Sequence, residues 1–294
     1  MNTKEIFNFE RFGKYFVSDL KTCRANYGLS LLVISVLVPL ATYILILGIT
    51  GMTGNIWQGP SIYLRAGMFV IAMLCMTITM PIKCYGRLTE KQYGSFWLSL
   101  PASRLEKFLS MILIVTIIAP AASAAIYLAV DFLNCMIDRS CGMSIIAGII
   151  ELFRGIEPMK NEIMLNMMAE APELVESMKT IMQHMFSPWI YLDEYIVACL
   201  PFLLGAIFFK SGKTVKTFLA IAAFSVIVSF IATPFMAGHY IKMLGSDMTD
   251  PEAVLQFYST GIFRHLALID TLSDTITNLA MLTAVWFRLK TLKH

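Results

Sequence analysis

Long apolar stretches alternate with short polar segments along this chain, and six of the stretches are as long as a membrane span. A helix needs about 20 mostly apolar residues to cross the hydrocarbon core of a bilayer. We therefore predict one all-α membrane domain over residues 1–294. Its six transmembrane helices are predicted at 27–50, 61–82, 108–130, 188–209, 217–240 and 266–287.

Two segments outside these spans have an amphipathic pattern. Within residues 6–23, apolar side chains recur at three- to four-residue steps, at Phe9, Phe12, Phe16 and Leu20. With basic residues between them, this pattern predicts a helix lying in the membrane interface. Within the loop 135–187, the part from Pro158 to Phe186 divides at Pro172 into two predicted amphipathic helices. The loop's apolar run 141–150 is too short to cross a membrane, so we interpret that run as interfacial or packed.

The polar segment 83–107 lies between the second and third predicted spans and holds seven charged residues. Its start predicts a short helix, because Thr89 and Gln92 have the spacing of a capping box. One face of this helix would carry large side chains at i, i+3, i+4 and i+7, namely Tyr93, Phe96, Trp97 and Leu100. Pro101 should end the helix, since the residue before a proline is pushed out of the helical region.

A second capping box follows directly. Ser103 and Glu106 are three residues apart at the start of the next apolar stretch, which predicts a new helix there. The segment 83–107 therefore reads as a short amphipathic helix with a defined start, stop and restart. Two interpretations stay open: the helix docks a partner, or it lies on the lipid surface.

Composition supports a membrane protein with several spans. Hydrophobic residues make up 57% of the 294 residues and charged residues only 15%, against about 25% in a soluble domain. The mean hydropathy is +0.69. The net charge of +3 is small, so nothing in it indicates a nucleic-acid partner.

The distribution of charge orients the spans, because short cytoplasmic loops are enriched in Lys and Arg. With the N-terminus inside, 16 of the 23 Lys and Arg residues lie in the N-terminal segment, in 83–107, in the loop near 213, and after the last span. The outside loop 135–187 is acidic on balance. We predict that both termini and the segment 83–107 face the cytoplasm.

The six cysteines show no CxxC pair and no metal-binding spacing, so we predict no metal site. Cys135 and Cys141 lie in one loop and can form a disulfide if that loop faces an oxidising space. Spacing alone does not fix the geometry that a disulfide requires.

Asp270 and Asp274 lie four residues apart on one face of the last predicted span. Carboxylates within a membrane are costly and usually face a cavity or a partner. Two interpretations stay open for this pair. The carboxylates line a translocation path or carry protons, or nearby hydroxyl groups satisfy them in a structural role.

The sequence Ser211-Gly212-Lys213-Thr214 resembles the end of a phosphate-binding loop, but the match is incomplete. The full pattern needs a glycine five residues before Gly212, and Ile207 stands there. The segment also follows a membrane helix rather than a strand. We therefore predict that the chain binds no cofactor and is not itself an enzyme.

In sequence motifs and topology, the region around 87–111 resembles the permease subunits of type-2 ABC exporters. The matching motifs are E-x-x-x-G, from Glu90 to Gly94, and LP-x-S-R-x-E, from Leu100 to Glu106. The order of an interfacial helix, six spans and cytoplasmic ends also matches that family. The 53-residue outside loop is longer than a minimal member would need, so no cargo is carried over.

This resemblance implies that residues 83–107 form a coupling helix that docks on a separate nucleotide-binding ATPase subunit. It also implies a permease homo- or heterodimer, surrounded by lipid in a bacterial cytoplasmic (inner) membrane. The residues expected to contact the ATPase are Glu90, Lys91, Tyr93, Gly94, Phe96, Trp97, Pro101, Ser103, Arg104 and Glu106.

Two other functions remain open on the sequence alone. The chain can be a membrane scaffold or assembly protein whose amphipathic helix serves a different partner. It can also be a proton-coupled carrier that uses Asp270 and Asp274.

Overall fold

The computed structural model describes residues 7–54, 56–57, 59–151, 153–155, 188–244 and 262–292, and these residues contain helices but no strands. The predicted all-α class is confirmed for this part of the chain. The chain divides into two compact units. The first comprises Met1–Leu152, Ala198–Thr214 and Met281–His294, and the second comprises Phe153–Val197 and Val215–Ala280.

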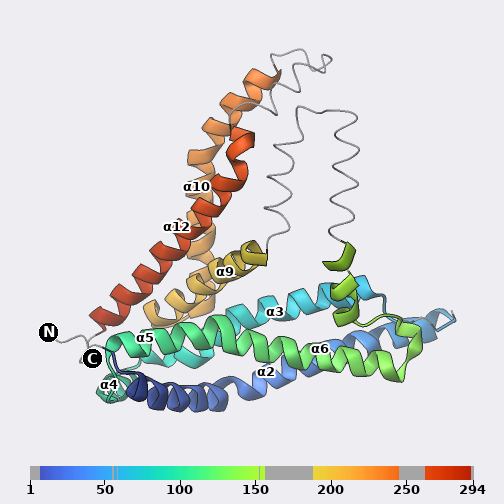
Figure 1. Ribbon diagram of the computed structural model, residues 1–294, viewed down its shortest axis with the longest axis horizontal. Helices are drawn as coiled ribbons and strands as arrows, with labels where there is room; N and C mark the ends of the chain where they lie inside the picture. The colour runs from blue at the N-terminus through green and yellow to red at the C-terminus, as the bar shows by residue number, and fades with distance from the viewer. Residues whose placement is uncertain are drawn as a thin grey trace. The chain divides into compact units, whose positions relative to one another are not determined.

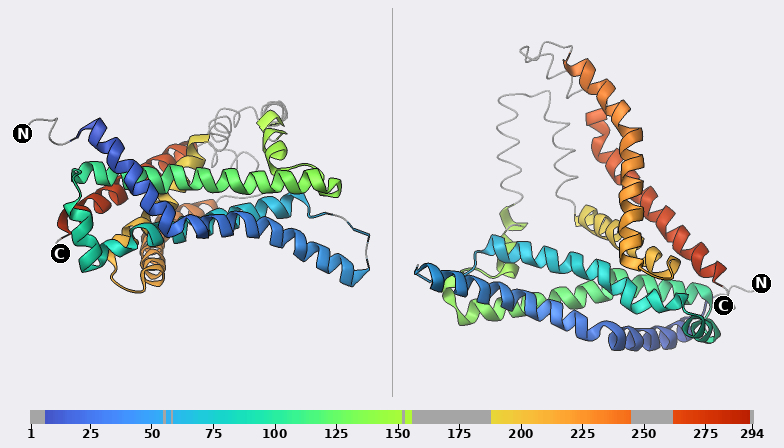
Figure 2. Two further views of the ribbon diagram at one scale, coloured as in Figure 1. Left: turned by 90° about the horizontal axis from the view of Figure 1, so that it is seen from below. Right: turned by 180° about the vertical axis from the view of Figure 1, so that it is seen from behind.

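Three long helical rods form the body of the first unit and run lengthwise beside one another (Figure 1; Figure 2). The first two rods are Phe9–Thr53 and Ile62–Tyr85, and the third is Arg104–Ile137, which consists of three consecutive helical pieces. In chain order the elements are α2 (Phe9–Thr53), α3 (Ile62–Tyr85), η1 (Gly86–Thr89), α4 (Lys91–Ser99), α5 (Arg104–Leu113), η2 (Ile114–Ile118), α6 (Ala119–Ile137) and η3 (Arg139–Cys141).

α2 is one unbroken helix of 45 residues. It begins after Asn8, whose side-chain oxygen accepts from the backbone N–H groups of Glu10 and Arg11, which satisfies donors that a helix start leaves unpaired. The amphipathic stretch predicted at 6–23 is therefore the first part of the same helix as the first span. The side it buries carries Tyr15, Asp19 and Cys23, whereas the predicted apolar stripe begins with Phe9, which is 83% exposed.

The three rods pack through a small apolar core. Ala72, Tyr127 and Ile145 are buried together, and the rings of Phe69 and Tyr127 meet edge to face at 5.1 Å. Ile145 belongs to the apolar run 141–150, so the packed alternative for that run is the one observed. Polar side chains also pair between the rods; the Ser35 and Ser123 hydroxyls lie 2.9 Å apart.

The third rod contains one π-helical turn, η2, at its centre. The N–H of Ala119 donates to the carbonyl of Ile114, five residues earlier. The next residue, Pro120, has no N–H to donate, so the α-helical ladder is already incomplete at this point. Such turns are accommodated inside longer helices without ending them.

The later described helices are α9 (Pro188–Phe208), α10 (Lys213–Leu244) and α12 (Ile262–Thr291). Together with the rods, they coincide with all six stretches predicted as spans. Among the described residues, four helices are long and apolar enough to cross a membrane: Phe9–Thr53, Ile62–Thr89, Arg104–Ile137 and Lys213–Phe230. The described part of the chain is thus helical and contains helices that suit a membrane protein.

Most of the loop predicted at 135–187 lies outside the described residues, including the division at Pro172. Its first part is helical at 139–141 and 145–151. Cys135 and Cys141 are both free thiols in this structure. Burial and the nearby Asp138 carboxylate raise the pKa of Cys141 to about 11, so this thiol is protonated at neutral pH.

Candidate docking helix

α4 lies at one end of the first unit, between α3 and α5 (Figure 1). The predicted capping box between Thr89 and Gln92 is wrong. α4 begins at Lys91 after Glu90, which makes no side-chain cap. Thr89 instead ends η1, where its hydroxyl donates to the Gly86 carbonyl at 3.1 Å. Thr89 is therefore part of the 3-10 turn and does not cap α4.

The predicted end of α4 is confirmed. The helix stops at Ser99, and Leu100, the residue before Pro101, has an extended ψ of 139°. The capping box at the start of α5 is also confirmed. Ser103 accepts from the backbone N–H of Glu106 at 3.2 Å, and the Glu106 carboxylate accepts from the N–H of Ser103 at 2.8 Å.

The aromatic residues of α4 do not share one environment. Trp97 is only 5% exposed and packs against the first unit, as does the buried Gly94, whereas Phe96 is 62% exposed. Tyr93 is half-buried, and its ring lies 5.0 Å from the Arg87 guanidinium. Burial raises the pKa of Tyr93, so its phenol remains neutral. The face predicted to be continuous is therefore split into an anchoring residue and an outward-facing one.

Lys107 holds the C-terminal end of α4. Its side chain is almost completely buried, and its ammonium donates to the carbonyls of Trp97 at 2.7 Å and Leu98 at 3.1 Å. The same ammonium lies 4.9 Å from the centre of the Trp97 ring. A cation at a helix C-terminus satisfies carbonyls that have no intrahelical donor and stabilises the helix dipole. Sequence reasoning missed this role because Lys107 looks like an ordinary interfacial lysine.

Glu106 joins α4 and α5 to the beginning of α2. Its carboxylate is completely buried and accepts from Arg11 through Nε at 2.8 and 3.0 Å and through Nη2 at 2.8 Å. The backbone N–H of Asn8 donates to it at 2.8 Å, in addition to that of Ser103. Five hydrogen bonds from three residues in two chain segments compensate for burying this charge.

Two further basic side chains tie this end of the unit together. The Lys213 ammonium donates to the carbonyl of Gly86, to the hydroxyl of Thr89 at 2.7 Å and to the carbonyl of Ala206 at 3.1 Å. Arg104 donates through Nη1 to the Lys290 carbonyl at 2.6 Å. The segments before and after α4 are thus fixed to the start of α10 and to the last turn of α12.

The outward surface of this element is mostly polar, with one large apolar side chain. Among the predicted contact residues, the exposed ones are Glu90, Lys91, Phe96, Pro101 and Arg104. The buried ones are Gly94, Trp97 and Glu106, which support the surface rather than form it. A central aromatic ring within a polar rim is the arrangement found at the energetic centres of protein interfaces.

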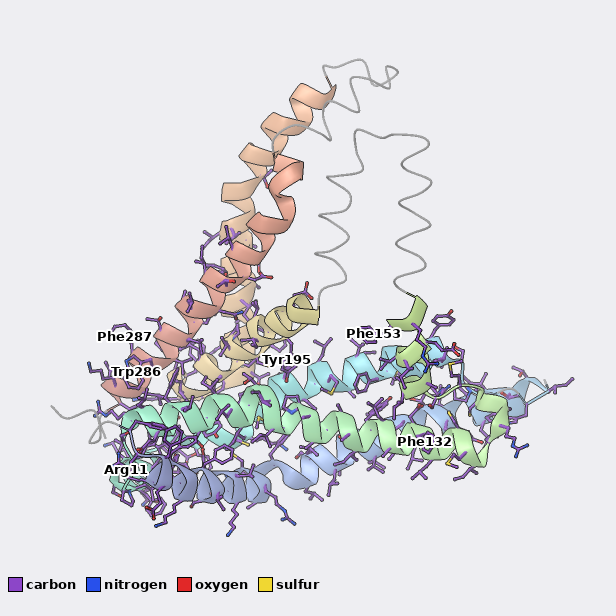
Figure 3. The ribbon with its side chains drawn as sticks, viewed as in Figure 1. Arg11, Phe132, Phe153, Tyr195, Trp286 and Phe287 are labelled. Atoms are coloured by element: carbon purple, nitrogen blue, oxygen red, sulfur yellow. The ribbon has the colours of Figure 1, made fainter. Side chains whose placement is uncertain are left out.

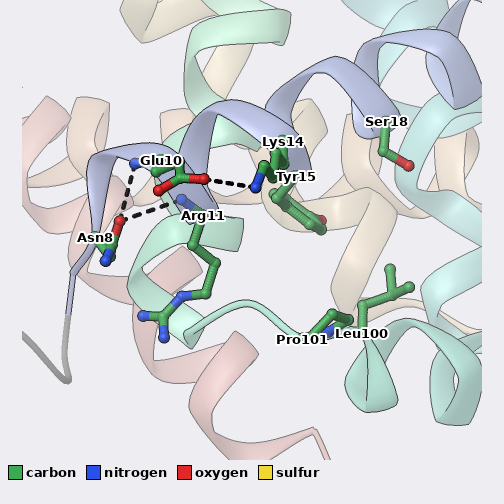
Figure 4. Close-up of a pocket in the computed structure, with 8 residues that line it drawn as sticks. All are labelled: Asn8, Glu10, Arg11, Lys14, Tyr15, Ser18, Leu100 and Pro101. Carbon is green, nitrogen blue, oxygen red and sulfur yellow. Dashed lines mark hydrogen bonds and ion pairs between the residues drawn. The ribbon is translucent and has the colours of Figure 1, made fainter.

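A groove of about 490 Å³ adjoins this surface, between the first turns of α2 and the end of α4 (Figure 4). Tyr15 and Ser18 line it from α2, and Leu100 and Pro101 line it from the α4–α5 turn. The ion pair between Lys14 and Glu10, at 2.6 Å, lies along its edge. In Figure 3, Arg11 marks this end of the unit and Phe132 the opposite end.

At the opposite end, the structure contains a buried ion pair that the sequence did not reveal. Arg65 Nη1 lies 2.7 Å from the Asp131 carboxylate, with side-chain exposures of 6% and 2%. The guanidinium also donates to the Pro60, Cys141 and Met143 carbonyls. A buried charge is tolerated when its hydrogen bonds are complete, and this pair joins the beginning of α3 to the C-terminal part of α6.

The structure describes the two predicted translocation residues only in part. Asp270 and Asp274 both lie in α12, in the second unit. The side chain of Asp270 is outside the part of the chain that the structure describes, and Asp274 is half-buried and has an interaction partner. Four residues apart in one helix, they share a face as predicted.

No protein-family model, curated protein or solved structure matches the chain. The geometry of α4 and its supports is therefore the basis for the functional interpretation.

Proposed function

We propose that this chain is the membrane-spanning permease subunit of an ATP-driven exporter of the type-2 ABC class. In this proposal α4 is the helix on which a separate nucleotide-binding ATPase subunit docks. The observation that carries the proposal is that hydrogen bonds of Lys107, Glu106 and Lys213 hold α4 and the segments on either side of it. Phe96 on α4 nevertheless remains 62% exposed. A helix that only lies on lipid needs no such bracing.

The bracing fits the transmission of force. Lys107 secures the end of α4, Glu106 joins the following turn to α2, and Lys213 secures η1 before it. Glu106 and Lys107 are buried and Lys213 is half-buried, and their contacts leave the exposed side of α4 available. A partner that pushes on α4 would therefore move the ends of the rods with it, rather than deform a loose loop.

The proposal also covers the topology. All six predicted spans would cross a bacterial cytoplasmic (inner) membrane, with both termini and α4 on the cytoplasmic side and two permeases forming a homo- or heterodimer. Exposed leucine, isoleucine and valine side chains along α2 support lipid contact, among them Leu29, Leu32, Val33, Leu37, Ile44 and Leu45. The direction of transport, export, rests on the family resemblance.

The contacts of Lys213, the lysine of the incomplete phosphate-binding sequence, support a separate subunit as the ATPase. Lys213 is directed at protein oxygens, namely two carbonyls and the Thr89 hydroxyl. In a phosphate-binding loop the lysine reaches the β- and γ-phosphates instead. Energy from ATP would thus come from another subunit.

Co-purification tests the proposal. The full chain, extracted from native membranes in mild detergent, should bring down a subunit that contains a complete phosphate-binding loop and hydrolyses ATP. Replacing Phe96 by Ala should remove this subunit from the preparation while the permease is still inserted and recovered. Recovery of the wild-type chain alone under the same conditions, with ATPase activity absent, would contradict the proposal.

A further inference from the structure

The α9–α10 connection contains a lysine whose position is unusual for a short basic loop. Lys213 is the first residue of α10, and it follows Gly212, whose φ of +59° is in the left-handed region that favours glycine. This turn directs the Lys213 side chain back toward η1 and α9 instead of into solvent. Its neighbour Lys210, three residues earlier, is exposed.

Lys213 links the start of α10 to η1, and it lies 124 residues from Thr89 in the chain. Its ammonium donates to both the Gly86 carbonyl and the Thr89 hydroxyl of η1, the element immediately before α4. It also donates to the carbonyl of Ala206, near the end of α9. An ammonium group has three N–H donors, so all three are used within the protein.

We infer that Lys213 is the positioning residue that transmits displacement of α4 to the beginning of α10. This inference rests on the proposed docking of an ATPase at α4. Lys213 is covalently part of α10, so a displacement of η1 that keeps these hydrogen bonds must move the first turn of α10 as well. The glycine at 212 and the exposed Ser211 leave this turn free of bulky side chains that would oppose such a movement.

Hydrogen–deuterium exchange on the permease–ATPase complex tests this role. Exchange is measured with and without a non-hydrolysable ATP analogue in two peptides, one covering 86–99 and one covering 211–220. For the wild type, we expect the nucleotide to change exchange in both. For Lys213→Met, we expect the change at 86–99 to remain and the change at 211–220 to be lost. Lys210→Met removes the same charge from the same loop and should behave like the wild type.

Thr89→Val is a milder second variant, since it removes one acceptor and leaves Lys213 in place. It should reduce the response at 211–220 without abolishing it, and it keeps the test decisive if Lys213→Met does not fold. A nucleotide response at 211–220 that survives in both variants overturns the role of Lys213. A wild-type complex that responds at 86–99 but not at 211–220 also overturns it, while leaving the docking proposal intact. The absence of a complex, or of any response at 86–99, instead contradicts the proposed function.

Discussion

The Arg11 guanidinium clasps the Glu106 carboxylate through Nε and Nη2, across 95 residues of sequence. Glu106 has no exposed surface, whereas the Arg11 side chain is 37% exposed. This pair joins the first turn of α2 to the first turn of α5. Because Ser103 of the same capping box lies four residues after the end of α4 at Ser99, the pair also fixes the turn that follows α4.

Loss of the Glu106 carboxylate should destabilise this end of the protein. In Glu106→Ala, the backbone N–H groups of Asn8 and Ser103 lose their acceptor, and Arg11 loses its counter-ion. A buried donor left unpaired costs about 1–3 kcal/mol, so we expect the free energy of unfolding to fall by about 2–3 kcal/mol. Denaturant titration in detergent, followed by tryptophan fluorescence, measures this change.

Glu10→Ala is the matched control for that measurement. Glu10 pairs with Lys14 at 2.6 Å, but both side chains are more than three-quarters exposed. Exposed ion pairs on a helix contribute little to stability, so this variant should unfold like the wild type. Equal losses in the two glutamate variants would show that Glu106 has no special structural role.

The two aromatic residues of α4 should separate binding from folding. Phe96→Ala removes an exposed ring, so we expect unchanged stability and ATPase binding weaker by about 2 kcal/mol, a factor of roughly 30, as for an interface hot spot. Trp97→Ala removes a buried ring and should cost about 3–5 kcal/mol of unfolding free energy. Binding is measured by titrating the purified ATPase onto the permease in detergent.

Phe132→Ala provides the control for exposed phenylalanines. Phe132 is 45% exposed, but it lies at the opposite end of the first unit (Figure 3). ATPase binding should be unaffected by this change. If Phe96→Ala binds the ATPase as tightly as Phe132→Ala does, α4 is not the docking helix.

The sequence was sufficient where structure depends on local spacing or on long apolar runs. All six apolar stretches are helical, Pro101 ends α4, and the Ser103–Glu106 capping box forms. These features are encoded within a few neighbouring residues or within a single helix. The same local reasoning failed at Thr89, because its hydroxyl donates within the 3-10 turn to Gly86 and accepts from Lys213 instead of capping α4.

Interactions between distant segments could not be read from the pattern. Arg65 looked like a single charge in an apolar stretch, and Asp131 fell one residue beyond the predicted end of another. Only the packing of α3 against α6 brings these two together, at 2.7 Å. The support of α4 by Lys107 and Lys213 has the same origin, since a lysine's partners depend on what folds beside it.

The buried pair between Arg65 and Asp131 should be essential to stability. In Asp131→Asn the Arg65 guanidinium stays buried without a counter-ion, and breaking such a pair costs about 3–5 kcal/mol. The same denaturant titration detects this loss. Arg139→Met changes an exposed charge nearby and should have no effect.

A paired replacement distinguishes charge from packing at the same site. Arg65→Met combined with Asp131→Leu removes both charges and keeps apolar volume, which often restores stability. We expect the double variant to be more stable than Asp131→Asn alone. A double variant that is less stable than the single one would show that the hydrogen bonds to the surrounding carbonyls matter more than charge balance.

Acid should weaken the turn after α6 through Asp138. Its carboxylate accepts from Tyr43 at 2.6 Å, from the Trp57 indole at 2.7 Å and from the Ser140 N–H at 2.9 Å. The hydrogen bonds from Ser140 and then Tyr43 hold the pKa of Asp138 well below its ordinary value. A carboxyl with a lowered folded-state pKa stabilises the fold above its unfolded value of about 3.9, and this contribution is lost as the pH falls further.

The melting temperature measured between pH 7 and pH 3 tests this prediction. Asp138→Asn should melt below the wild type at neutral pH, and the difference should shrink as the pH falls below about 4, where the carboxyl of the unfolded wild-type chain begins to bind a proton while that of the folded protein is still ionised. Tyr43→Phe removes one donor and should give a smaller difference with the same pH trend. Glu10→Gln, which alters an exposed carboxylate, should follow the wild-type curve. A difference between Asp138→Asn and the wild type that stays constant over the whole range would show that Asp138 acts through shape, not through its charge.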